Sequence, residues 1–192
     1  MDLIIGKNKK KYINTIAENY LCVPAVLETI LESENIHSLN MYSIADYFGV
    51  VLPCNITYPM INNVSHSSKS KELGITLKYD SINTFFADFN IPLCEQYIGI
   101  NMIHRDFFVD YVSDILSSGK HIICGFEYHS LYNTIGEYTG HVSIIVDADV
   151  SKETINILDP GPKEPGQKTI LAESLYRAVS FAKDGLWVIS RK

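Results

Sequence analysis

One stretch of the chain places a cysteine directly before an amphipathic helix: Leu21-Cys22-Val23-Pro24-Ala25-Val26-Leu27-Glu28-Thr29-Ile30-Leu31. Proline is tolerated in the first turn of a helix, so Pro24 predicts a helix that begins at Val23 or Pro24. Cys22 then lies at or beside the N-cap. Five apolar residues have the i, i+3, i+4, i+7, i+8 spacing of a helix that buries one face: Val23, Val26, Leu27, Ile30 and Leu31.

The predicted position of Cys22 favours nucleophilic chemistry. The unpaired N–H groups and the positive end of the helix dipole stabilise a thiolate relative to a thiol. The same N–H groups could hold an oxyanion, so one position would offer a nucleophile and part of its transition-state stabilisation. The alternative is inert packing, because free cysteines are among the most buried residue types.

Composition predicts one globular domain, residues 1–192. Hydrophobic residues make up 46% of the chain and charged residues 20%, which excludes global disorder. A formal net charge of -6 argues against a nucleic-acid partner, which would require a basic face. The apolar run Leu3-Ile4-Ile5 is too short for a signal peptide, and no window approaches the length of a membrane span. We therefore expect a cytoplasmic protein with no membrane partner.

Neither the cysteines nor the histidines have the spacing of a metal site. The cysteines form no C-x-x-C pair, so we expect four free thiols without a zinc site or a disulfide framework. The histidines form no H-x-x-x-H pair, and we expect no metal and no other cofactor. The residues concerned are Cys22, Cys54, Cys94, Cys124, His37, His66, His104, His121, His129 and His141.

Three further helices are predicted in the first 118 residues, and each has one apolar face. Gly49 supplies the stop of the first of them, and Ser81 is the expected cap of the second, with Phe89 facing inward. The predicted ranges are 38–49, 81–90 and 106–118.

Two polar segments interrupt this helical part. Residues 55–71 form a long loop, which is either a functional lid or a dispensable surface insertion. The lysine cluster at residues 7–11 is expected to be a solvated arm, followed by a short extended segment.

Strands dominate the remainder of the chain, with one helix near the end. Helices first and strands later predict an α+β domain with two lobes and a cleft between them: a mainly helical lobe, 1–118, and a mainly β lobe, 119–192. The predicted strands are 93–98, 121–128, 141–146, 154–158 and 186–190, and the helix is 171–181.

Two of these strands bring a histidine and an aspartate together. The runs 140–146 and 154–160 are joined by a short polar connection, which predicts an antiparallel hairpin. If it is symmetric about Val150, His141 faces Asp159 and the carboxylate can orient the imidazole as the base for a thiol. The alternatives are a hydrogen-bonded histidine at a strand end and an aspartate that starts a turn before proline.

These motifs resemble the papain-like cysteine peptidase superfamily, and within it the C39-like branch. The similar segments are Cys22-Val23-Pro24-Ala25, Gly140-His141-Val142 and Leu158-Asp159-Pro160, and the order Cys, His, Asp also agrees. The resemblance implies a papain-like two-lobed fold, in which the helical lobe packs on an antiparallel sheet. It also implies a catalytic triad of Cys22, His141 and Asp159.

Two positions depart from the family pattern. Members usually carry a glutamine some six residues before the nucleophile, and its amide completes the oxyanion hole, whereas this chain has Ile16. Asn14, Asn19 and the backbone N–H of Cys22 are the candidates for that role here. Val23 stands where the branch prefers glycine.

The resemblance implies acyl transfer through a thioester on Cys22. The altered oxyanion position favours an amine acceptor, and hence an amide-forming acyltransferase of secondary-metabolite or nonribosomal peptide biosynthesis, similar to butirosin-type and closthioamide-type relatives. The donor would be a carrier-protein thioester or a peptide, and the acceptor a small amine. The alternatives are a cysteine peptidase or amidase and a non-catalytic peptide-binding homologue. Four residues are candidates to line the cleft: Tyr20, His129, Tyr132 and Tyr138.

Overall fold

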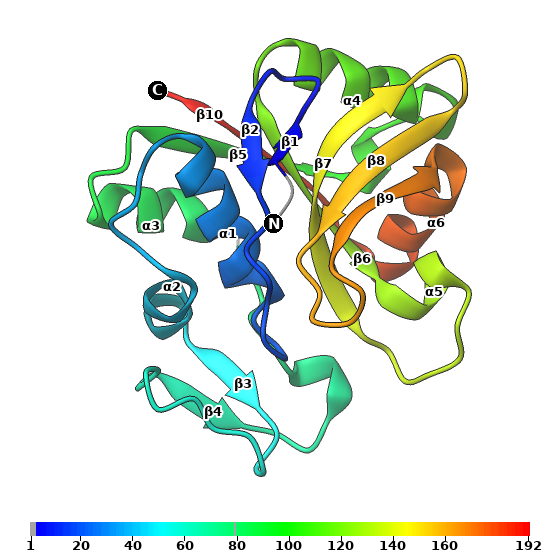
Figure 1. The fold of residues 1–192 in the computed structure, drawn as a ribbon. Coiled ribbons are helices and arrows are strands. Elements are labelled where there is room, and N and C mark those ends of the chain that lie inside the picture. The colour runs from blue at the N-terminus through cyan, green and yellow to red at the C-terminus, as the bar shows by residue number, and fades with distance from the viewer. Residues whose placement is uncertain (1–2, 79) are drawn as a thin grey trace.

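The structure is a computed structural model that describes residues 3–78 and 80–192. Its centre is a six-stranded sheet in the order β5-β10-β6-β7-β8-β9, with every neighbouring pair antiparallel (Figure 1). The strands are β5 (Leu93–Gly99), β6 (His121–Glu127), β7 (Gly140–Asp149), β8 (Thr154–Asp159), β9 (Gly166–Leu171) and β10 (Gly185–Arg191).

Helices cover both faces of this sheet. α1 (Cys22–Ser33) and α3 (Ser81–Asp88) contribute to one core, together with alternate strand residues such as Ile123. α4 (Phe108–Ser117) and α6 (Ala172–Ala182) contribute to a second core on the opposite face. Because β6 is covered on both sides, all seven of its residues are buried.

Smaller elements flank α1. β1 (Leu3–Ile5) and β2 (Lys11–Ile13) form a hairpin, and β3 (Val50–Leu52) pairs in parallel with β4 (Val64–His66). α2 (Met41–Phe48) and β3 pack on the start of α1 in a third core that includes Leu21. The remaining elements are α5 (Tyr128–Tyr132) and the 3-10 turns Ser70–Glu72, Ile100–Met102 and Arg105–Phe107.

The expected α+β class, with helices packed on an antiparallel sheet, is confirmed. The expected division at residue 118 is corrected, because β5 pairs with β10 within the sheet and α4 packs on the face opposite α1. The ends of the helices differ from the predicted ones by up to three residues. α1 begins at Cys22 itself, and α2 begins only after Asn40, whose side chain accepts a hydrogen bond from Ser43 N. Ser81 does not cap α3, because its hydroxyl donates to the Lys78 carbonyl instead.

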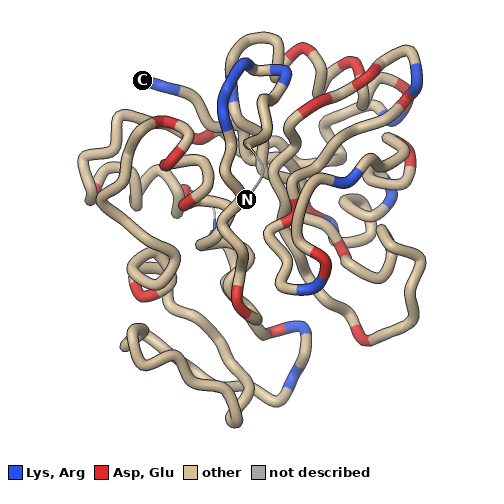
Figure 2. Tube along the Cα trace, in the orientation of Figure 1, with Lys and Arg blue, Asp and Glu red and all other residues tan. Residues whose placement is uncertain are grey.

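Three other expectations about the first part of the chain are corrected. Phe89 is 41% exposed rather than inward-facing, since α3 ends before it. The long loop contains β4. The lysine cluster, which lies at the β1–β2 turn (Figure 2), is not a free arm: Lys7 donates to Ser113 and to the Ala148 carbonyl, and Lys10 pairs with Glu34.

Among the described helices and strands, those not predicted are β1, β4, β9 and the short helix α5. β9 is an edge strand whose residues alternate between intermediate and exposed, so it lacks a strong apolar period. Within the described residues, no helix combines the length and apolar character needed to cross a membrane.

Candidate active site

The start of α1 presents Cys22 to a cavity. Tyr20 has a φ of 69°, which is uncommon for a residue with a side chain, and it turns the chain into the helix. Leu21 accepts the first helical hydrogen bond, from Ala25 N. Among the described hydrogen bonds, the Cys22 N–H has no acceptor, so it is available to a developing oxyanion. The Cys22 side chain is half-buried and lines the cavity.

The β7–β8 hairpin brings His141 and Asp159 together by a different register from the one expected. Asp149 rather than Val146 pairs with Thr154, and the register shifts once more between Ile145 and Asp147. Beyond that irregularity Ile144 pairs with Leu158, so Asp159 lies diagonal to His141 rather than opposite it. An offset of two residues keeps both side chains on one face of the sheet. His141 Nε2 donates to Asp159 Oδ1 at 2.9 Å.

Asp159 is fully buried and each of its carboxylate oxygens has two donors. Oδ1 also accepts from Gly161 N at 2.8 Å, and Oδ2 accepts from Tyr132 Oη at 2.6 Å and from Lys168 Nζ at 2.9 Å. Burial by itself raises the pKa of this carboxyl, but the hydrogen bonds and the charge of His141 outweigh burial and hold the pKa well below its ordinary value. Asp159 is therefore a permanent anion beside the imidazole.

His141 has the Asp159 carboxylate and Cys22 as its two partners, and its side chain is 8% exposed. The edges and faces of Phe126 and Tyr128 enclose the ring, at centroid distances of 5.4 Å and 5.6 Å. Burial lowers the pKa of the imidazole, but the hydrogen bonds with Asp159 and Cys22 raise it to about 9. Since Nε2 is bound to Asp159, Nδ1 is the nitrogen left for the thiol. The arrangement places a protonated imidazole beside the Cys22 side chain at neutral pH.

The segment before α1, residues 14–17, holds the backbone at the end of β8. Asn14 Nδ2 donates to the Asp159 carbonyl at 2.8 Å, and Ala17 N donates to the Pro160 carbonyl at 2.8 Å. The structure thus corrects the expectation for Asn14, which is buried, does not line the cavity and anchors the Asp159 backbone instead. Ile16 is exposed, and Asn19 lines the cavity, so Asn19 and the Cys22 N–H remain the oxyanion candidates.

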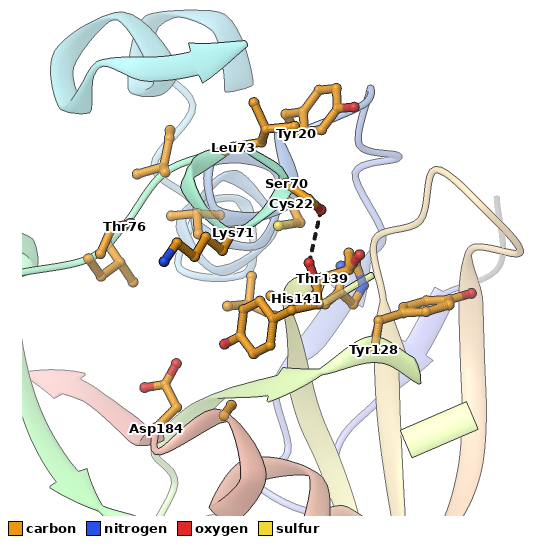
Figure 3. A pocket seen from close by; sticks show the side chains of 18 of the residues that line it. Tyr20, Cys22, Ser70, Lys71, Leu73, Thr76, Tyr128, Thr139, His141 and Asp184 are labelled. Carbon is orange, nitrogen blue, oxygen red and sulfur yellow. Dashed lines mark hydrogen bonds between the residues drawn. The ribbon is translucent and has the colours of Figure 1, made fainter. Parts of the chain in front are cut away.

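The cavity has a volume of about 820 Å³ and is lined by the start of α1 and residues 70–78 together with residues of the central sheet. Ser70 Oγ donates to the Tyr138 carbonyl at 2.9 Å and so joins the two sides (Figure 3). Of the four predicted cleft residues, three line the cavity, and Tyr132 lies behind Asp159 instead. Four other residues line the cavity without belonging to any motif recognisable in the sequence: Tyr97, Tyr128, Asp184 and Trp187.

The comparisons with known proteins bear on the fold. No protein-family model matches the chain, and no curated protein matches it. One similar solved structure comes from Bacillus anthracis and is named, provisionally, a C39-like peptidase. It superposes with a TM-score of 0.60 at 12% sequence identity, covering 100% of this chain and 99% of that one. The chain therefore has the fold of a C39-like, papain-like peptidase.

Proposed function

We propose that this chain is a cysteine-dependent acyl-transfer enzyme that forms a thioester on Cys22 and passes the acyl group to an amine. One observation carries the proposal: His141 has Cys22, at the start of α1, and Asp159 as its two partners, and Asp159 is buried and bound by four donors. A thiol, an oriented base and a fixed anion are the parts that nucleophilic acyl transfer requires.

The roles of the three side chains follow from this geometry. The Cys22 thiolate attacks the donor carbonyl carbon, a C–S bond forms, and the negative charge moves to the carbonyl oxygen beside the Cys22 N–H. The His141 imidazolium protonates the leaving group as its bond to carbon breaks, which leaves a thioester. An amine then attacks the thioester carbonyl, His141 takes the amine proton, a C–N bond forms and the C–S bond breaks to restore the thiolate. Asp159 keeps its charge throughout and orients His141.

The bridge between Ser70 and Tyr138 supports a small or end-on donor rather than a long peptide. It joins the two sides of the cavity, whereas an endopeptidase binds an extended chain along an open groove. An acyl thioester on a flexible arm, or a chain terminus, enters a cavity that is closed on one side more readily than the middle of a polypeptide does.

A hydrolase is the second candidate, with water as the acceptor. The likeness to a protein named as a C39-like peptidase favours it. The same residues would act in both reactions, and only the species that resolves the thioester differs.

Intact-protein mass spectrometry tests the proposal. We expect incubation with the N-acetylcysteamine thioester of a short acyl group to add that acyl mass to Cys22, and Cys22→Ala to abolish the adduct. Cys54→Ala, which removes an exposed thiol, is the matched control and should leave the adduct unchanged. Added small primary amines should then yield an amide product. Free acid in the presence of excess amine would instead establish the hydrolase, and full turnover by Cys22→Ala would reject both.

A further inference from the structure

A carboxylate lines the cavity across from the thiol. Asp184 lies between α6 and β10, and Figure 3 shows its side chain on the side of the pocket away from Cys22. Its backbone is fixed at both ends, because Asp184 N donates to the Val179 carbonyl and Ile100 N donates to the Asp184 carbonyl. The chain therefore holds this carboxylate at one place in the cavity wall.

A glycine makes room for the carboxylate. A Cβ at Gly125 would come within 2.4 Å of Asp184 Oδ2, so the absence of a side chain there lets the oxygen lie over the strand β6. Oδ1 accepts from Gly185 N at 3.0 Å and lies 3.5 Å from Tyr97 Oη. In the described hydrogen bonds Oδ2 has no donor, and it remains open to a ligand in the cavity.

Asp184 is a half-buried anion without a counter-ion. Among the described ion pairs none includes Asp184. Burial raises the pKa of its carboxyl, and the hydrogen bonds from Gly185 and Tyr97 lower it. Burial is the larger effect, so the pKa is raised to about 6. Four exposed lysines also line the cavity, and none of them forms a described ion pair with Asp184: Lys71, Lys78, Lys163 and Lys183.

Aromatic rings surround the carboxylate. Tyr97 and Trp187 both line the cavity, with ring centroids 5.2 Å apart. Burial is the main cause that raises the pKa of the Tyr138 phenol, and the nearby charge of Asp184 raises it further. A carboxylate beside aromatic faces is a favourable environment for an organic cation, which gains an ion pair and cation–π contacts together.

We infer that Asp184, with Tyr97, Tyr138 and Trp187, forms a subsite for an ammonium or guanidinium group of the substrate. The inference rests on the proposed function, because it assigns a chemical class to the molecule that occupies the same cavity. The cation is a group remote from the reacting carbonyl, such as the far end of a diamine or a basic side chain. Its binding would orient the substrate while a different atom of the substrate reacts at Cys22.

Trp187 is the chain's only tryptophan, so its fluorescence reports on this subsite directly. The probes are three unreactive propionamides of equal length whose tails end in a guanidinium, a methyl or a carboxylate group. For the full-length protein we expect the guanidinium probe to bind at least about tenfold more tightly than the methyl probe, which corresponds to about 1.4 kcal/mol. Asp184→Asn, which retains the Oδ1 acceptor for Gly185, should remove this preference.

Two further variants make the result specific. Asp80→Asn removes another carboxylate of the cavity lining, at an exposed position with φ 61° that suits asparagine, and should retain the preference. Tyr97→Leu should weaken the guanidinium probe several-fold and the methyl probe little. Equal affinities of wild type and Asp184→Asn for the guanidinium probe would overturn the inference, as would tighter binding of the carboxylate probe. Failure of the proposed chemistry would appear separately, as absence of a Cys22 acyl adduct while the guanidinium probe still binds.

Discussion

Tyr132 donates a 2.6 Å hydrogen bond to Asp159 Oδ2, the carboxylate oxygen that does not bind His141. Lys168 lies above the Tyr132 ring, with Nζ 4.4 Å from the ring centroid, and donates to the same oxygen. The carboxylate is thus held from the side opposite the imidazole. His141 can keep its orientation only if Asp159 keeps its own, so Tyr132 acts as a positioning residue for the candidate triad.

Tyr132→Phe should therefore lower the rate of thioester formation without removing any reacting group. A hydrogen bond to a charged acceptor contributes about 1.5 to 3 kcal/mol, so we expect a loss of about tenfold or more. Without this donor the pKa of Asp159 rises, and the acid limb of the pH–rate profile should move to higher pH. Stopped-flow acylation with a thioester donor, followed across pH, measures both effects.

The control for this variant is Tyr111→Phe, a half-buried tyrosine of the second core that lies outside the cavity lining. It should leave both the rate and the acid limb unchanged. If the acylation rate of Tyr132→Phe were lower by the same factor at every pH, with the acid limb unchanged, then Tyr132 would not influence the protonation of Asp159.

The protonated state of His141 predicts how Cys22 responds to alkylation. Because the pKa of the imidazole is raised to about 9, the imidazolium persists through neutral pH and falls away only as the pH rises towards 9. A cationic neighbour favours the reactive thiolate form. We expect iodoacetamide to modify Cys22 at pH 6 to 7 at least about tenfold faster than in His141→Ala. Peptide mass spectrometry after timed quenching gives the site-specific rate.

Cys54 supplies an internal reference for that measurement, because it is exposed in the same molecule. Its alkylation rate should be the same in wild type and in His141→Ala. Equal rates at Cys22 in the two proteins would show that the imidazole does not activate the thiol, and would favour a binding protein that has lost the chemistry.

Most helices and strands, and the closeness of His141 to Asp159, could be predicted from sequence because each depends on local pattern, whereas the meeting of this pair with Cys22 was implied only by the family resemblance. The apolar stripe after Cys22 specifies α1, and His141 and Asp159 stand at ends of two short strands joined by a turn. The hairpin register was wrong because the turn is tighter than expected and the irregularity after Ile145 has no marker in a single sequence. Tyr132 as a partner of Asp159, like Asp184 in the cavity wall, depends on the packing of segments that are distant along the chain.

A second buried cluster of charges predicts how stability depends on pH. His121 Nε2 donates to Glu34 Oε1 at 2.8 Å, and Tyr12 Oη lies 2.7 Å from His121 Nδ1 and serves as its donor. Arg191 and Lys10 also bind the Glu34 carboxylate. Burial lowers the pKa of His121, whereas hydrogen bonding to His121, above all, lowers the pKa of Glu34.

Both shifts make the protein less stable in acid. A group with a lowered folded pKa contributes stability that is present above its unfolded pKa and is lost as the pH falls. The unfolded chain takes up a proton at His121 below about pH 6.5 and at Glu34 below about pH 4.5, the ordinary pKa values of these groups. The stability that each group contributes is therefore lost as the pH falls below these values. We expect the urea midpoint to fall between pH 7 and pH 5, and His121→Gln to reduce that fall. His37→Gln, at an exposed histidine, is the matched control. An equal fall in wild type and His121→Gln would exclude His121 as the cause.

Glu34→Gln should be destabilising at pH 7. Glu34 is buried and accepts hydrogen bonds from His121, Arg191 and Lys10, but the Lys10 and Arg191 side chains are 27% and 61% exposed, so their charges remain solvated in the variant. We therefore expect a loss of about 1 to 3 kcal/mol, the cost of breaking a hydrogen bond at a buried polar group. The free energy of unfolding from urea titration measures the loss, and Glu32→Gln, an exposed residue of the same helix that pairs with His37, should cost less than about 1 kcal/mol. Comparable losses in the two variants would mean that the Glu34 network contributes no more than a surface pair.

The bridge from Ser70 to Tyr138 predicts a change in substrate range. Ser70→Ala removes the one side-chain hydrogen bond found, among the described residues, between the Ser70–Glu72 turn and the second lobe. Because the turn lines the cavity but has no described hydrogen bond to His141 or Asp159, we expect KM for a small thioester donor to rise several-fold with kcat nearly unchanged. Longer peptide donors should gain relative to small ones, since the cavity is then open on that side. Ser67→Ala, whose hydroxyl bonds only within the same segment, is the control and should leave the ratio of the two donors unchanged. A fall in kcat with an unaltered KM would instead place Ser70 in the chemistry of the site rather than in its closure.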